Sequence, residues 1–152
     1  MAIPNPVEAK PKFFSVEEAN RSLPLVRAIV GDIVRQFEVV NEHKQRLIAL
    51  KNLQRRPGGV AEAQAEETVQ GQAALEGEEA QLVAYMEELA RLGIKFKGFD
   101  GLCDFPSLRD GREVYLCWRL GEADVRFWHE VNAGFAGRQP VDPSAVVDHH
   151  CL

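Results

Sequence analysis

The sequence has no CxxC spacing, no excess of basic charge and no long apolar run, and each absence argues against a class of protein. The cysteines Cys103, Cys117 and Cys151 show no CxxC spacing, so neither a disulfide framework nor a zinc knuckle is predicted and we expect reduced thiols. The net charge of −5 argues against binding to nucleic acid. No segment approaches the roughly 18 apolar residues that span a bilayer, and no signal peptide is recognisable. We therefore expect a cytoplasmic protein that binds neither nucleic acid nor membranes.

The length of 152 residues suits a single domain, and the hydrophobic fraction of 45% is ordinary for a globular protein. Changes of composition along the chain divide this domain into four parts. We expect an extended, proline-rich arm at 1–12, a helical hairpin at 13–92, a β-rich cap at 93–141 and an irregular tail at 142–152.

The first helix is indicated by its capping residues. Order should begin at Phe13, and Ser15 and Glu18 fit a capping box, so a helix should start there. Pro24 lacks a backbone N–H and is costly inside a helix. We therefore predict a short helix that ends near Ser22, followed by a second helix with Pro24 in its first turn.

Helical periodicity then continues over two long arms. In the first arm the seam positions recur at alternating steps of four and three, at Val26, Val30, Ile33, Phe37, Val40, Lys44, Leu47 and Lys51. The segment RRPGG breaks this pattern, and a second arm runs from about Val60 to Leu92, with Gly93 as its C-cap. Two arms of roughly 30 residues joined by a short loop must pair antiparallel over about 45 Å. Because two helices alone bury little, we expect a homodimer with a four-helix arrangement.

The last third changes to glycine-punctuated segments rich in aromatic and β-branched residues, which indicates strands and turns. We predict short strands at 94–96 and 102–105, a turn at Asp110-Gly111, a hairpin of 112–120 with 125–131, and an irregular tail from Pro140 onward. The fold class is therefore α+β, a long antiparallel helical hairpin with a small antiparallel β-rich cap.

Several strings in the chain carry a family resemblance: FFSVEEANRSLPLVRAIV near the start, and DFP, LCWRLGE, WHE and GFAGR in the cap. Together they resemble a bacterial family known as domain of unknown function 2203, from about Phe13 to Val141. The resemblance implies a helical N-terminal half and a cap whose motif positions here are Asp104, Cys117, Trp118, Glu122, His129 and Arg138. It implies no activity.

Residue types that bind Zn²⁺ or similar metals gather in the cap, at Asp104, Glu113, Cys117, His129 and Glu130. Whether they converge depends on the register of the 112–131 hairpin. An odd number of loop residues puts Cys117 on the face of His129, and an even number puts it on the face of Glu130. Both registers are open from sequence. We take Asp104, Cys117 and His129 as candidate ligands of a divalent metal such as Zn²⁺.

Cys117 and His129 also suit roles that need no metal. In the alternative without a metal, Cys117 is a small buried apolar residue, His129 a hydrogen-bonded residue of the sheet and Glu130 a solvated charge at its edge. A nucleophilic Cys117 with His129 as its base is a further alternative, although no local signature supports it. The sequence contains no GxSxG, Walker, HExxH or GxGxxG motif. No catalytic residue is therefore assigned.

A ligand pocket is a further hypothesis. Aromatic residues surround the glycine-rich loop 134–137, whose backbone N–H groups and the following Arg138 could approach an anion. We take Trp118, Trp128 and Arg138 as candidate ligand-binding residues, with plain core packing as the alternative. The terminal His149, His150 and Cys151 would chelate metals adventitiously.

The leading functional hypothesis is a non-enzymatic binding or assembly module that acts through helical dimerisation and the aromatic-rich cap. It is favoured by the long hairpin and by the absence of common catalytic motifs. The alternative is a metal-dependent enzyme, in particular a hydrolase, that uses Asp104, Cys117 and His129 with Glu113 or Glu130 as a further ligand or acid/base group. Neither hypothesis identifies a substrate, a small-molecule ligand or a protein partner.

Overall fold

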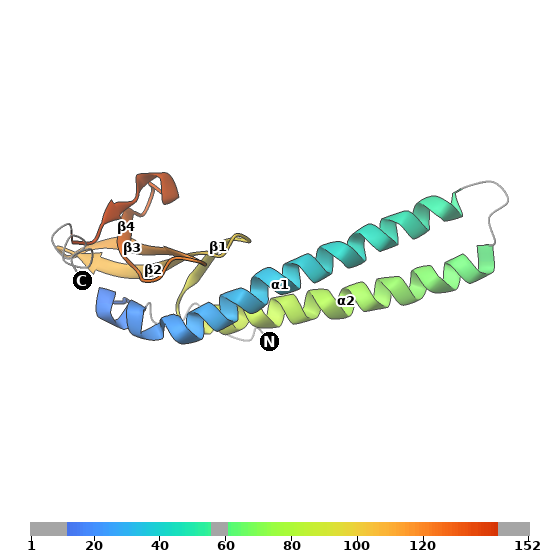
Figure 1. Ribbon diagram of the computed structural model, residues 1–152, viewed down its shortest axis with the longest axis horizontal. Helices are drawn as coiled ribbons and strands as arrows, with labels where there is room; N and C mark the ends of the chain where they lie inside the picture. Colours follow the sequence, from blue (N-terminus) through green and yellow to red (C-terminus); the bar gives the residue numbers. More distant parts are fainter. Residues whose placement is uncertain (1–11, 56–60, 143–152) are drawn as a thin grey trace, which may run out of the picture.

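The computed structural model describes residues 12–55 and 61–142 and confirms the α+β fold (Figure 1). Residues 1–11 of the predicted arm and most of the predicted tail, including His149, His150 and Cys151, lie outside the described residues. Two long helices are followed by an antiparallel sheet with strands in sequence order: α1 (Val16–Gln54), α2 (Ala61–Arg91), β1 (Lys95–Gly98), β2 (Leu102–Arg109), β3 (Arg112–Arg119), β4 (Phe127–Glu130) and β5 (Gln139–Pro140).

Helix α1 begins as predicted but is not interrupted at Pro24. The Ser15 hydroxyl accepts from the Glu18 N–H at 3.0 Å, and the Glu18 carboxylate accepts from the Ser15 N–H at 3.3 Å, which completes the capping box. The prediction of two helices separated near Ser22 was wrong, because α1 runs continuously through Pro24. Burial of Leu23 and Val26 on either side of the proline offsets a cost of about 3 kcal/mol. The dark-blue first turns lie at an angle to the rest of α1 (Figure 1).

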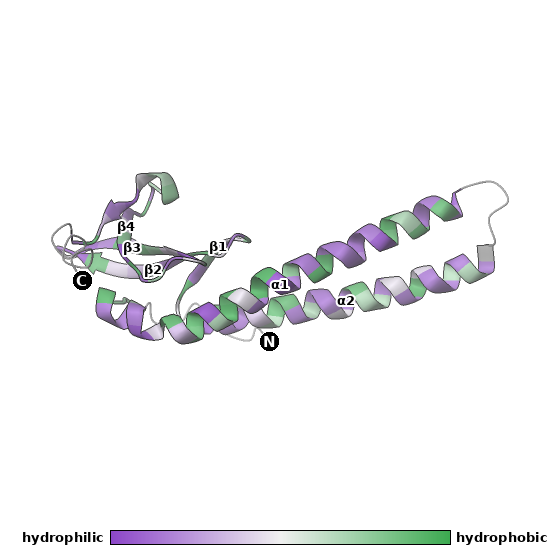
Figure 2. Ribbon diagram, viewed as in Figure 1, coloured by the Kyte–Doolittle hydropathy of each residue, from purple (hydrophilic) through white to green (hydrophobic). Residues whose placement is uncertain are grey.

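The two helices pack antiparallel along most of their length, as expected. With 39 residues, α1 is about 58 Å long, so the hairpin extends well beyond the sheet. Its far half has a small apolar core of Val40, Leu47 and Leu75. Lys44 and Lys51 are exposed, and polar residues are interspersed along the outer hairpin (Figure 2). The seam is therefore weaker toward its tip than beside the sheet.

The strands β2 and β3 form the central hairpin of the sheet. Asp110 and Gly111 have φ angles of 53° and 77°, the left-handed conformations that a two-residue turn between twisted strands requires. The predicted turn is confirmed. The predicted strand 102–105 was too short, because β2 continues to Arg109 and pairs with β3 all the way to this turn.

The ends of the last strands also differ from the prediction. The 125–131 segment was expected to be extended throughout, but β4 covers only Phe127–Glu130. Val125 is held instead by the Asn20 side chain of α1, which accepts from its N–H at 2.7 Å and donates to its carbonyl at 3.3 Å. Pro140 does not begin an irregular tail, because it pairs with Phe127 as part of β5. Proline is tolerated in β5 because this strand forms the edge of the sheet.

The main core lies between the helices and one face of the sheet. That face contributes alternating residues of β2, β3 and β4, together with Val125 of the connecting loop: Cys103, Phe105, Val114, Leu116, Trp118, Val125 and Trp128. The chain before α1 is tied to β2, since Phe14 donates to the Pro106 carbonyl at 2.7 Å and its own carbonyl accepts from Ser107 Oγ at 2.6 Å. Within the described residues, neither helix combines the length and apolar character of a membrane span.

Candidate metal centre

The register of the β3–β4 pair puts Cys117 and His129 on the same face of the sheet. Tyr115 is directly opposite His129, and Cys117 is directly opposite Phe127, so the connecting loop has an odd number of residues. Asp104 of β2 is directly opposite Cys117 on the other side of β3. Because directly opposed residues point to the same side, all three side chains share the sheet face that points away from the helices.

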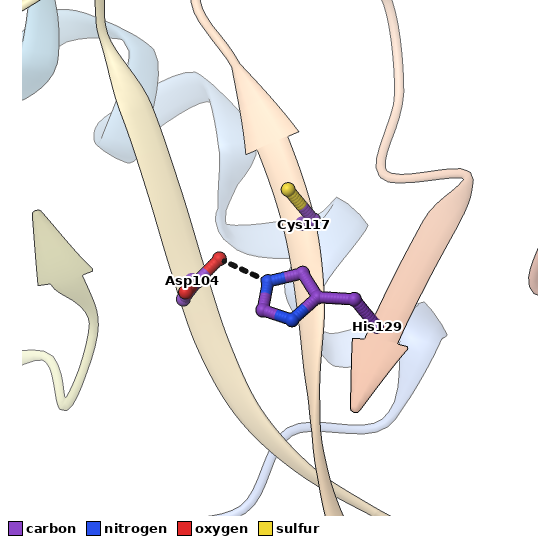
Figure 3. Close-up of side chains that lie close together, drawn as sticks. All are labelled: Asp104, Cys117 and His129. Carbon is purple, nitrogen blue, oxygen red and sulfur yellow. Dashed lines mark hydrogen bonds and ion pairs between the residues drawn. The ribbon is translucent and has the colours of Figure 1, made fainter. Parts of the chain in front are cut away.

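The three candidate ligands converge (Figure 3). One ligand atom from each of Asp104, Cys117 and His129 lies within 4.8 Å of the other two. The residues are 3%, 0% and 2% exposed, although they occupy the sheet face opposite the main core. Sequence reasoning proposed this trio, and the fold brings it together from three separate strands.

Hydrogen bonds fix the orientation of the His129 ring. Its Nδ1 is 2.7 Å from the carbonyl oxygen of Glu130, which can only accept, so Nδ1 carries a hydrogen. Its Nε2 is 2.9 Å from Asp104 Oδ1. Donation from Nδ1 to a backbone carbonyl is typical of metal-binding histidines, and it makes Nε2 the ring nitrogen available to a metal. In the structure Nε2 pairs with Asp104.

The donor set fits a small divalent metal. Zn²⁺ binds carboxylate oxygen, imidazole nitrogen and thiolate sulfur at about 2.0–2.3 Å, which separates the ligand atoms of a tetrahedral site by about 3.4–3.7 Å. The observed spread of up to 4.8 Å and the 2.9 Å contact between His129 and Asp104 bracket this separation. Small side-chain rotations would therefore suffice. The thiol of Cys117 selects against Mg²⁺ and Ca²⁺, which prefer oxygen ligands.

The thiols are poorly suited to act as free nucleophiles. Burial raises the pKa of Cys117 to about 11, an effect that the guanidinium of Arg138 partly offsets and the Asp104 carboxylate increases. Burial also raises the pKa of Cys103 to about 12, with smaller contributions from Asp104, Cys117 and Asp100. Without a metal both groups stay protonated near neutral pH, which disfavours the thiol-catalysis alternative. A bound Zn²⁺ would deprotonate a coordinating thiol.

Arg138 lies beside this group in a contact that the sequence did not predict. Its guanidinium forms two hydrogen bonds with the Glu122 carboxylate, at 2.8 and 2.6 Å, and also donates to the Cys117 carbonyl at 3.0 Å. It stacks on Phe127 and Phe135, whose ring centroids are 4.3 and 4.6 Å away. The guanidinium proposed to meet an anionic ligand therefore already binds a carboxylate of the chain itself.

The two tryptophans are separated from the trio. Trp118 and Trp128 lie on the opposite sheet face, within the main core, and are 0% and 6% exposed. The structure therefore does not place them in one pocket with Arg138 or His129. Glu130 is also on that face, where it pairs with Arg112 at 2.7 Å.

Two residues on the trio's face were missed by sequence reasoning. Lys95 is directly opposite Asp104 in the sheet, and its Nζ donates to the Tyr115 hydroxyl at 2.8 Å. The Tyr115 ring centroid is 5.7 Å from that of His129. Nothing in the sequence indicated the contact between Tyr115 and a lysine of β1.

This fold and site define an α+β protein with a buried Asp/Cys/His group on the outer face of its sheet. The chain belongs to the family described as uncharacterized conserved protein DUF2203, whose model matches residues 12–141. The match covers both helices, the sheet and all three candidate ligands. No curated protein and no solved structure matches the chain.

Proposed function

We propose that this protein is a metal-centred binding module in which Asp104, Cys117 and His129 hold one Zn²⁺ ion. The observation that carries the proposal is the convergence of the three ligand atoms within 4.8 Å. Support comes from the His129 ring, whose Nδ1–H is directed to the Glu130 carbonyl and whose Nε2 faces Asp104 Oδ1 at 2.9 Å, so that a metal would take the place of the hydrogen between these two atoms.

Burial favours binding over catalysis at this centre. Each ligand residue is at most 3% exposed, so a substrate of appreciable size has no direct access to the metal. The metal would link β2, β3 and β4 at one point and hold the outer face of the cap in a defined shape. Such a cap is suited to recognise a small ligand or another protein, which agrees with the binding module favoured by the sequence.

Metal analysis by mass spectrometry tests this proposal. The full chain should carry His149→Ala, His150→Ala and Cys151→Ser, so that the tail cannot chelate metal. We expect about one Zn²⁺ per chain after purification without chelators, and its loss in Cys117→Ser and His129→Ala, because each removes one of only three protein ligands.

Cys103→Ser is the matched control for that experiment. Cys103 is a second buried cysteine of the same sheet, but it lies on the opposite face in the main core. It should keep the full metal content. Circular dichroism would establish that each variant is folded. The proposal would be overturned if Cys117→Ser and His129→Ala bound as much zinc as the parent protein, in which Asp104, Cys117 and His129 are all present. It would also be overturned if the parent protein bound no zinc when zinc is supplied.

A metal-dependent hydrolase is the second candidate function. It is favoured by the number of ligands, because catalytic zinc sites have three protein ligands and an open position, whereas structural sites usually have four. In this case the metal would activate a water molecule at the open position. The same zinc-loaded protein and its His129→Ala variant can be compared for hydrolysis of activated esters and phosphoesters, and metal-dependent turnover would favour the enzyme.

We also propose that the helical hairpin dimerises. Its outer surfaces expose apolar side chains along both helices, including Ile48 of α1 and Val69 and Val83 of α2, which are 51%, 69% and 51% exposed. We expect a dimer in analytical ultracentrifugation, shifted to monomer by Val69→Asp with Val83→Asp, because each buries a charge in the interface. Leu108→Asp, at an equally exposed position on β2, is the control. A monomeric wild type over the full accessible concentration range would contradict dimerisation.

A further inference from the structure

Lys95 and Tyr115 form a donor pair beside the trio. The Lys95 ammonium donates to Tyr115 Oη at 2.8 Å and thereby occupies a lone pair of that oxygen. The Tyr115 O–H is then directed elsewhere, and the structure shows no acceptor for it among the described residues. Two N–H groups of the ammonium are likewise left without a partner in the described part of the chain. The pair therefore presents several donors that no acceptor among the described residues uses.

The position of this pair connects the buried trio to solvent. Both residues share the trio's sheet face, because Lys95 is directly opposite Asp104 and Tyr115 is directly opposite His129. Lys95 is exposed, Tyr115 is half-buried and His129 is buried. Exposure therefore decreases along this face from Lys95 through Tyr115 to the trio.

The charges at the site favour an anion. Zn²⁺ with the Asp104 carboxylate and the Cys117 thiolate is electrically neutral. The positive charge of Arg138 is balanced by Glu122 at 2.6 Å. Lys95, by contrast, has no carboxylate within 4.0 Å among residues 12–55 and 61–142. Among the described residues Lys95 is therefore a cation without an ion-pair partner, on the sheet face that carries the trio.

We propose that a small monoanionic carboxylate binds at the metal, with one oxygen in the open coordination position and the other accepting hydrogen bonds from Lys95 Nζ and Tyr115 Oη. This inference rests on the proposed metal centre. A carboxylate has two oxygens, so one can bind the metal while the other accepts hydrogen bonds from the Lys95–Tyr115 pair. A second charge on the ligand would have no partner at the site, which disfavours dianions.

Cobalt substitution and acetate titration test the inference on the full chain with the tail substitutions above. Co²⁺ in a site with a thiolate ligand absorbs visible light, and its spectrum responds to a change in coordination. At constant ionic strength, acetate should produce a saturable spectral change. Lys95→Gln should raise the Kd for acetate about tenfold, because it removes a charge-assisted hydrogen bond. Tyr115→Phe should raise it as well, with the cobalt content unchanged in both variants.

Lys97→Gln is the matched control, since Lys97 is the next lysine of β1, is also exposed and contributes the same charge. It should leave the Kd within about twofold of the parent, as expected for a screened charge without a direct contact. Equal weakening by Lys95→Gln and Lys97→Gln would overturn the inference, as would a cobalt spectrum that does not respond to acetate. A chain that retains no cobalt overturns the metal centre itself, so the two failures are distinguishable.

Discussion

Gly101→Ala should destabilise the protein by about 3–5 kcal/mol, the largest effect that we expect from adding one methyl group to this fold. Gly101 has a φ of +93°, a conformation that strains any residue with a Cβ. An added Cβ would also lie 2.5 Å from Leu120 Cβ, which is fixed to the backbone and has no freedom to move away. The same junction is held by the Leu120 N–H, which donates to the Gly101 carbonyl at 3.0 Å.

Gly121→Ala measures the cost of backbone strain without the steric overlap that Gly101→Ala would also cause. Gly121 has a φ of +105°, but an added Cβ would meet nothing within 4 Å. It should cost about 1–2 kcal/mol, from backbone strain alone. Urea denaturation of both variants measures the difference directly. Equal losses for the two alanines would show that the close approach of Gly101 and Leu120 does not constrain the fold.

Arg138→Ala should destabilise the cap by about 3 kcal/mol, because it removes one partner of a half-buried ion pair and leaves the Glu122 carboxylate uncompensated. The guanidinium also donates to the Cys117 carbonyl and covers two aromatic rings. Combining it with Glu122→Gln in a double-mutant cycle should give a coupling energy of about 1–3 kcal/mol. Additive losses would contradict a direct contribution of this pair.

Arg119→Ala is the control for that cycle. Its guanidinium also stacks on Phe135, at 4.7 Å, but its ion pair with Asp100 is long, at 3.7 Å, and exposed. It should cost less than about 1 kcal/mol.

The contribution of the Glu122 carboxylate to the stability of the protein should also depend on pH. Burial by itself would raise the pKa of Glu122, but hydrogen bonds from Arg138 and the Arg119 backbone outweigh it and hold the pKa below the usual 4.5. The stability provided by the Glu122 carboxylate is therefore complete above pH 4.5. This contribution should be lost as the pH falls through the lowered pKa of Glu122 and the carboxylate becomes protonated.

Local signals were sufficient for much of the fold. The Ser15 capping box and the left-handed Asp110-Gly111 turn each depend on neighbours in sequence, and both predictions are confirmed. The predicted seam of the first arm is buried at its apolar positions Val26, Val30, Ile33, Val40 and Leu47, but Lys44 and Lys51 are exposed. Pro24 and Val125 were misjudged because their conformations are decided by distant partners. Packing against the sheet keeps the helix continuous at Pro24, and the Asn20 side chain withdraws Val125 from its strand.

For the candidate site, residue types were predictable but their neighbours were not. Asp104, Cys117 and His129 could be selected by their chemistry, whereas their convergence required the β3–β4 register, which a long loop leaves undetermined. The Arg138–Glu122 and Lys95–Tyr115 contacts join segments 16 and 20 residues apart in sequence. No local periodicity encodes such pairs.

The hairpin contains two apolar clusters, and Leu82 packs against both of them. The outer cluster consists of three buried residues, far fewer than the cluster beside the sheet. Local opening free energy depends on the apolar contacts that are lost, so the outer turns should open and close many times for each global unfolding event. The outer turns of α1 and α2 should therefore have their own conformational equilibrium. They could adapt their shape to a partner while the strands that carry the metal ligands stay closed.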